Sequence, residues 1–227
     1  NGIKSMDEVK KIFWRYGEWP GLLRVETKNK ILSLKKFYYN YLIPFFISKN
    51  CLITPDFTGE LSDISIGDAW SPVLEKKGHG YSIIISRSSY FDKMLNNLHK
   101  KKIIDLKKNS KISTIQMHSH MLEFKKIGSY LRLKKLEKKG PVPLYDLRPY
   151  DVSYQRRLIE SIIGFIIKLA SNKNIKYIFS LVSSNLLGIM FEFFRSLWKS
   201  LTKPTKRKGF LNQKFIKIKN DRLNEFL

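Results

Sequence analysis

The chain has 227 residues, of which 43% are hydrophobic and 13% aromatic, and 43 Lys and Arg against 19 Asp and Glu give it a formal net charge of +24. This apolar content is enough to form a buried core, so a wholly disordered chain is excluded, and the single cysteine, Cys51, excludes a disulfide framework or an all-cysteine metal site built from this chain alone. So large a positive charge suggests a nucleic acid, an anionic membrane surface or an acidic protein as partner.

The positive charge is unevenly distributed along the chain. Residues 1–80 contain 12 basic and 9 acidic side chains, whereas residues 81–147 contain 15 and 5, and residues 148–227 contain 16 and 5. The stretch from Cys51 to Pro72 has no Lys or Arg and four acids. The basic excess therefore lies in the last two thirds, and this acidic segment stands out from the rest.

The first third of the chain has strand patterns on both sides of a helical pattern. Residues 22–34 predict two short strands joined by a turn, and residues 35–46 have helical character that Pro44 interrupts. Residues 48–60 are rich in Pro, Asp, Thr and Gly and predict a loop. Apolar residues then alternate with small polar ones from residue 61 to Gly67, which is typical of a strand that enters a tight turn.

The middle of the chain combines strand and helix patterns. A β-branched run at 81–87 predicts a strand, residues 90–100 have helical spacing, and residues 102–106 predict a further strand. A basic amphipathic pattern at 118–139, followed by Gly-Pro, predicts a helix with a defined end.

The last third contains two apolar helical stretches, 156–170 and 176–199, followed by a basic linker at 203–209. The longest uncharged run in the second stretch, 177–191, has about 15 residues, whereas a helix that spans a membrane needs about 20. These stretches therefore predict a helical hairpin that docks on another surface.

Together these patterns predict an α/β fold: a mixed sheet domain with flanking helices and a C-terminal helical hairpin extension. We place the domain boundary where the composition changes, with residues 1–147 in the α/β domain and residues 148–227 in the basic, apolar helical extension.

The segment CLITPDFTGELSDISIGDAW, residues 51–70, contains the residues that suggest a binding site. It offers a soft thiolate ligand on a loop and then a strand that ends in Gly67 and Asp68. A glycine permits close approach of the backbone, and a carboxylate accepts hydrogen bonds from ligand hydroxyls, which is how a strand end holds a flavin or a nucleotide.

This segment resembles the C-terminal domain of the coenzyme F-420 hydrogenase/dehydrogenase beta-subunit family. That family's pattern, C-x-x-C-x-D-x-x-x-x-x-A-D-I-S-x-G-D, is similar to CLITPDFTGELSDISIGD at 51–68. Two further motifs agree: YGEWPG at 16–21 resembles Tyr-Arg-Gly-x-x-Trp-Pro-Gly, and GYSIIISR at 80–87 resembles Gly-x-Ser-x-hydrophobic-Arg. The resemblance spans about residues 13–147, without the family's N-terminal half.

The resemblance implies an iron–sulfur flavoprotein that passes electrons between coenzyme F-420, as substrate, and a four-iron four-sulfur cluster by way of FAD. It implies Cys51 as a cluster ligand and Arg87 as a partner of a cofactor phosphate. It also implies that four residues lie near the flavin or the cluster: Asp63, Ser65, Gly67 and Asp68. The chain departs from the pattern at Thr54, which replaces the second cysteine with a poor iron ligand, so the remaining ligands would come from outside this sequence.

Simpler interpretations stay open beside these. Cys51 fits a buried thiol without a role, and Asp63 and Asp68 fit turn and strand-end capping. His118 and His120 fit a metal pair, or a surface pair at the start of a helix.

Trp14, Trp19 and Trp70 fit core positions better than stacking platforms. The lysine runs fit a solvated face, or the docking surface for an acidic partner or membrane. Nucleic-acid binding is not indicated, because basic groups interleaved with aromatics and reading motifs are both lacking.

Two functions follow. The first is part of an oxidoreductase that uses FAD and works with other redox subunits or an electron carrier. The second is a non-catalytic divergent member or fragment that docks on a membrane surface or a partner protein through its basic face and apolar helices. The single cysteine and the lack of a secretory pattern predict a cytoplasmic location. The alternative is a peripheral location at the inner face of the membrane.

Overall fold

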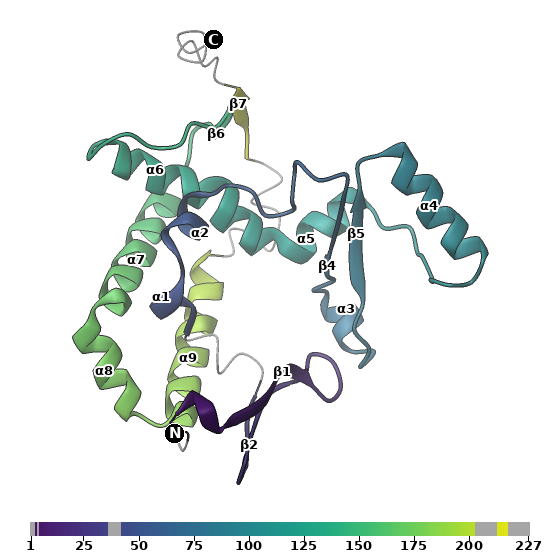
Figure 1. The fold of residues 1–227 in the computed structure, drawn as a ribbon. Helices are drawn as coiled ribbons and strands as arrows, with labels where there is room; N and C mark the ends of the chain where they lie inside the picture. The colour runs from purple at the N-terminus through teal and green to yellow at the C-terminus, as the bar shows by residue number, and fades with distance from the viewer. Residues whose placement is uncertain (1–2, 4, 36–41, 203–212, 218–227) are drawn as a thin grey trace. The chain divides into compact units, whose positions relative to one another are not determined.

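The computed structural model describes residues 3, 5–35, 42–202 and 213–217 (Figure 1). Two compact units share the chain: unit 1 comprises residues 1–48, 71–80 and 161–202, and unit 2 comprises residues 49–70, 81–160 and 203–227. Small antiparallel sheets and helices make up both units, so the predicted α/β class is confirmed. The predicted boundary at residue 147 stays a prediction.

Unit 1 begins with the short 3-10 helix η1 (Met6–Glu8) and a three-stranded antiparallel meander. Strands β1 (Val9–Tyr16), β2 (Leu22–Thr27) and β3 (Ile31–Lys35) pair in chain order. The two strands expected within 22–34 are confirmed. Strand β1 was not predicted; only two of its eight residues are even partly buried, so it lacks the alternation that identifies a half-buried strand. Thr27 closes the β2–β3 turn, where its hydroxyl donates to the Lys30 carbonyl and accepts from the Lys30 N–H.

The aromatic motif at 16–21 lies beside the glycine that opens the motif at 80–87. A Cβ on Gly80 would stand 3.1 Å from Cε3 of Trp19, so the glycine lets the chain lie against the indole ring. The Arg15 guanidinium lies over the same ring, 4.8 Å from its centroid. Trp19 is half-buried, whereas Trp14 is 57% exposed, so the expected core position of Trp14 is wrong.

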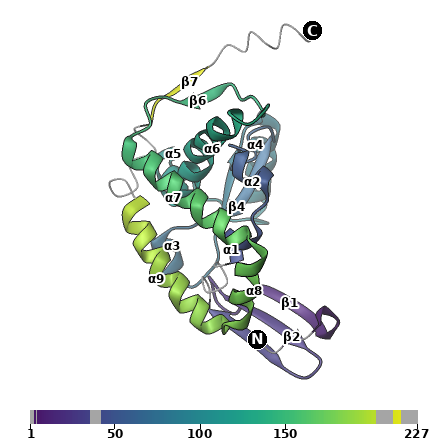
Figure 2. The ribbon, with the colours of Figure 1, turned by 90° about the vertical axis from the view of Figure 1, so that its left-hand side faces the viewer.

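Unit 1 also contains α1 (Leu42–Phe46), α3 (Pro72–Glu75) and the helices that follow residue 160. Helix α7 (Tyr154–Ser171) confirms the prediction at 156–170, but the stretch 176–199 is two helices, α8 (Lys173–Leu181) and α9 (Ser184–Thr202). The break follows from Ser183, whose hydroxyl accepts from the Leu186 N–H and caps α9. Figure 2 shows α9 turning back after α8.

Among the described residues, no helix is long and apolar enough to cross a membrane by itself. By length and composition, Lys173–Leu181 and Ser184–Phe193 pass that test only as a pair, bent by 113° at the break.

Unit 2 is built around two strands and a long helical run. Strands β4 (Ile64–Asp68) and β5 (Ser82–Ser86) pair antiparallel, and α4 (Ser89–Lys100) follows β5, as predicted for 81–87 and 90–100. The helical run comprises α5 (Lys111–Leu122), the π-helical segment η3 (Glu123–Gly128) and α6 (Ser129–Glu137). It is longer than the predicted 118–139, because the Ser110 hydroxyl caps α5 through the Ser113 N–H.

Two predictions for unit 2 are wrong. Residues 102–106 form no strand, because the chain turns at Lys102 with φ +57° and the His99 ring accepts the Leu106 N–H. The predicted loop 48–60 contains the short helix α2 (Lys49–Ile53), so Cys51 is helical.

The end of unit 2 is a small two-stranded sheet, β6 (Leu147–Pro149) and β7 (Phe215–Lys217), which pair antiparallel. Most buried apolar residues in the described part of unit 2 lie in the helical run or shortly after it: Leu122, Ile127, Leu133 and Val152. Ala69, next to the end of β4, is also buried. Residues 36–41 of the predicted first helix and the basic linker at 203–209 lie outside the described residues.

Candidate functional site

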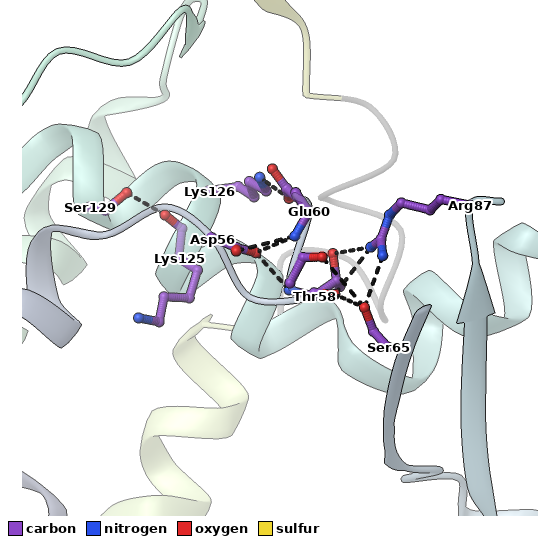
Figure 3. Close-up of polar contacts among 9 residues, drawn as sticks. Asp56, Thr58, Glu60, Ser65, Arg87, Lys125, Lys126 and Ser129 are labelled. Atoms are coloured by element: carbon purple, nitrogen blue, oxygen red, sulfur yellow. Dashed lines mark hydrogen bonds and ion pairs between the residues drawn. The ribbon is translucent and has the colours of Figure 1, made fainter. Parts of the chain in front are cut away.

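Arg87, directly after β5, connects the loop that precedes β4 to the β4–β5 sheet by hydrogen bonds (Figure 3). Its guanidinium donates to the Thr58 carbonyl and hydroxyl at 3.1 and 3.2 Å, and to the Ser65 hydroxyl at 2.8 Å. A fourth bond runs to the Ser62 carbonyl at 3.1 Å. We call these four residues the Arg87 clamp. All its acceptors are neutral, and among the described residues no carboxylate forms an ion pair with the exposed Arg87 side chain.

The loop inside the clamp is ordered by its own acids. The Asp56 carboxylate accepts from the N–H groups of Thr58 and Glu60, at 3.0 and 3.1 Å. Glu60 forms an ion pair with Lys126 of η3. Asp56 and Glu60 therefore stabilise the loop and its contact with the helical run. These two acids of the segment 51–72 have a structural role.

The end of β4 brings the predicted residues Gly67 and Asp68 next to α5. Gly67 pairs with Ile83 and Asp68 with Ser82, while Asp63 accepts the Arg87 N–H at 2.8 Å through its carbonyl. A Cβ on Gly67 would meet nothing within 4 Å, so this glycine leaves open space at the strand end.

His118 of α5 is a further functional candidate at this strand end. Burial lowers the pKa of His118, and the Asp68 carboxylate opposes this shift, so the two side chains interact electrostatically. The His118 ring lies 5.7 Å from the Phe57 ring, and its buried Nε2 has no hydrogen-bond partner among the described residues. A buried polar atom without a partner is costly, and a bound ligand would satisfy it.

Cys51 lies apart from the Arg87 clamp, on α2, and faces a buried lysine. The Lys125 ammonium donates to the Cys51 carbonyl at 2.6 Å and to Sγ at 3.4 Å. Arg132 of α6 donates to the Leu52 carbonyl at 2.6 Å, so two cations bind the short helix to the helical run. Thr54 uses its hydroxyl locally, as donor to the Asn50 carbonyl at 2.7 Å.

Arg132 also belongs to a buried ion cluster, which includes Arg156 and Glu160. Glu160 is 1% exposed and accepts from Arg132 at 2.5 Å and from Arg156 at 2.9 Å. Gly128 makes room for the cluster, because a Cβ there would stand 2.7 Å from Oε2 of Glu160. Burial raises the pKa of the neighbouring Glu123 to about 7, against the smaller lowering effect of Arg156.

The described residues do not fit an iron–sulfur cluster. The sequence has one cysteine, and Thr54, which stands where the family pattern has its second cysteine, donates its hydroxyl to the Asn50 carbonyl. No group of three or more His, Cys, Asp or Glu among the described residues could hold a metal ion, which also removes the metal interpretation of His118 and His120 for this part of the chain.

The same residues do fit the polar groups of a flavin nucleotide. The Arg87 clamp offers a cation to a phosphate, and His118 offers a buried nitrogen beside the carboxylate of Asp68. A separate pocket of about 210 Å³ lies in unit 2 between α6 and residues 142–157, and none of the predicted site residues lines it.

The structure places five of the six predicted site residues on or next to one strand pair, but at its two ends. Asp63, Ser65 and Arg87 lie where β4 begins and β5 ends, whereas Gly67 and Asp68 lie at the other end, opposite Ile83 and Ser82. Cys51 is on α2. The alternative of a buried thiol at Cys51 is wrong, since this residue is exposed.

Two residues of the site region have surroundings that the sequence patterns did not predict. His118 fitted a metal ligand or a surface residue at a helix start, but it lies half-buried near the end of α5. Lys125 lies in the basic amphipathic pattern predicted at 118–139, which gave this residue no particular role, but it is 8% exposed. Its spacing of three and four residues from the apolar Leu122 and Met121 was the signal that could have identified it.

Comparison with known proteins gives one match. Residues 1–112 match the model of the family described as the C terminus of the beta subunit of coenzyme F420 hydrogenase/dehydrogenase. The match includes all three motifs, begins before the expected residue 13 and ends before the expected residue 147. No curated protein and no solved structure matches the chain.

Proposed function

Through residues 1–112 the chain belongs to the coenzyme F420 hydrogenase/dehydrogenase beta-subunit family, a family of redox subunits, and we propose that it binds FAD along the β4–β5 strand pair. His118 and Arg87 would hold the FAD, which when bound would supply the chemistry that links hydride transfer from reduced coenzyme F-420 to single-electron transfer to a partner. The partner is another redox subunit or an electron carrier.

One observation carries the proposal: the buried Nε2 of His118 lacks a hydrogen-bond partner among the described residues, beside Asp68 at the end of the strand that the family motif occupies. A polar ring atom of a flavin would satisfy this nitrogen. Burial lowers the pKa of His118, which favours the neutral imidazole, and a neutral imidazole can donate or accept according to its tautomer.

The Arg87 clamp supplies the second contact, at the opposite end of the β4–β5 pair from Asp68. Its guanidinium is held by neutral acceptors, so the charge is available to a cofactor phosphate, and its position is fixed by four hydrogen bonds before the ligand arrives. A preorganised cation loses little side-chain freedom on binding.

We derive no electron-transfer step through an iron–sulfur cluster in this chain. Cys51 is the only cysteine of the sequence and the Thr54 hydroxyl bonds to the backbone, so this chain supplies too few ligands for a cluster at that position. A cluster that accepts electrons from the flavin would have ligands on other polypeptide sequence. The exposed Cys51 suits a reducing compartment, which supports a cytoplasmic location as part of the proposal.

The test is flavin binding by the whole chain. Titration of FAD, followed by quenching of flavin fluorescence, should give saturable binding, and His118→Ala should weaken it about 2- to 10-fold, the effect of one hydrogen bond. Asp92→Asn, on α4, is the matched control and should bind like the parent. Absence of saturable FAD binding by the folded chain would refute the proposal, and equal affinities of the parent and His118→Ala would refute the role of His118.

A further inference from the structure

Three consecutive helices of unit 1 expose apolar faces. In the part of α7 that belongs to unit 1, Ile162, Phe165, Ile166 and Leu169 recur at helical spacing and are 38–65% exposed. The buried Ile163 and Ala170 lie on another side of the helix, because their positions are rotated away from this stripe. Helix α7 therefore has apolar residues on an exposed face as well as on its buried face.

Helix α9 repeats this arrangement. Leu186, Ile189, Met190 and Phe193 recur at spacings of three and four residues and are 42–68% exposed, whereas the buried Leu187 lies on another face. The exposed apolar residues therefore form one stripe along the helix.

Between them, α8 exposes Tyr177, Ile178 and Leu181 by 67%, 58% and 70%. Single exposed apolar residues are common on protein surfaces, but stripes on three successive helices are not. Such stripes indicate that these helices contact an apolar phase or partner outside the described residues.

The charge of the same region identifies the partner. Residues 161–208 contain nine Lys or Arg and a single acid, Glu192. A basic segment with aromatic and aliphatic faces is typical of helices that lie on anionic lipid, where the cations meet headgroups and the apolar faces enter the acyl boundary. A protein surface that met these stripes would also have to be unusually acidic.

We propose that α7, α8 and α9 form an interfacial anchor that binds the chain to anionic membrane surfaces. The helices lie along the interface, because α7 and α9 each carry polar residues beside the apolar stripe, such as Lys168 and Asn185, and because α8 and α9 are bent by 113°. The anchor would hold the redox site of the same chain close to the membrane.

Sedimentation with vesicles tests the anchor. The whole chain should sediment with vesicles of phosphatidylcholine and phosphatidylglycerol at about 100 mM NaCl, and at least ten-fold less at about 500 mM NaCl or with pure phosphatidylcholine. The double variant Phe165→Ser, Leu181→Ser should lower the partition coefficient at least ten-fold, because it lacks two apolar side chains that the parent buries at the acyl boundary. Both positions are exposed, so the fold should persist.

Ile103→Ser, at a position 64% exposed in unit 2, is the matched control and should sediment like the parent. Binding equal to that of the parent by the double variant would overturn the anchor. So would self-association of the parent without vesicle binding, which would make a second copy the occupant of the apolar faces. FAD binding should be the same in the double variant and the parent, so failure of the anchor is distinguishable from failure of the flavin proposal.

Discussion

Replacing Glu160 by alanine removes the acceptor that two buried arginines share. Arg132 and Arg156 both donate to this carboxylate, and the side chain of Glu160 is 1% exposed. After the substitution Arg132 keeps its bonds to the Leu52 and Phe124 carbonyls, and Arg156 keeps a 3.4 Å contact with the Glu123 carbonyl. Neither arginine then has the carboxylate that balanced its charge.

The expected loss of stability is large. Removal of one partner from a buried ion pair costs about 3–5 kcal/mol, because the remaining charge stays away from water without compensation. Here two guanidinium groups lose the same partner but retain backbone acceptors, so we expect a decrease of about 4 kcal/mol in the free energy of unfolding. For a chain of this length that corresponds to a decrease of roughly 8–16 °C in Tm.

Thermal and urea unfolding, followed by circular dichroism, measure this effect. Glu192→Ala is the control, because Glu192 is exposed on α9 and an exposed substitution should change stability by at most about 0.5 kcal/mol. If Glu160→Ala costs less than about 1 kcal/mol, or no more than Glu192→Ala, the ion cluster does not stabilise unit 2 as we reason.

Three further predictions concern the same unit. Gly128→Ala should destabilise by about 2 kcal/mol in urea unfolding, because its Cβ would stand 2.7 Å from a Glu160 oxygen, whereas Gly164→Ala, with nothing within 4 Å, should be neutral or stabilising; equal effects would contradict this. The raised pKa of Glu123, about 7 when folded against 4.5 when unfolded, means that its stabilising effect is complete below pH 4.5 and is lost as the pH rises through 7. The free energy of unfolding should therefore fall between about pH 5 and 8, by at most about 3 kcal/mol, and Glu123→Gln should flatten this dependence. Ser65→Ala removes a hydrogen-bond acceptor of Arg87, so it should lower the free energy of unfolding by about 1 kcal/mol and increase amide hydrogen exchange in the loop 56–62. Unchanged exchange would show that the clamp does not order the loop.

The helices and strands that the sequence predicted are those with a strong local period. The β-branched run at β5, the helical spacing of α4 and the apolar repeat of α7 each lie within a residue or two of their predicted bounds. The failures have local causes that no period reveals. The α8–α9 break depends on a cap by Ser183, and residues 102–106 turn because their backbone groups bond to the end of α4.

The charge of +24 and the single cysteine were visible in the sequence, and so was the family, because short motifs such as SDISIGD keep their order along the chain. Only the tertiary structure decided what the individual groups do. Lys125 and Arg132 look solvent-facing in a basic helix, yet packing buries them, and a buried cation must find acceptors, here the backbone of α2 and Glu160. The sequence determines which charges exist, whereas burial and distance determine which are structural and which can meet a ligand or a membrane.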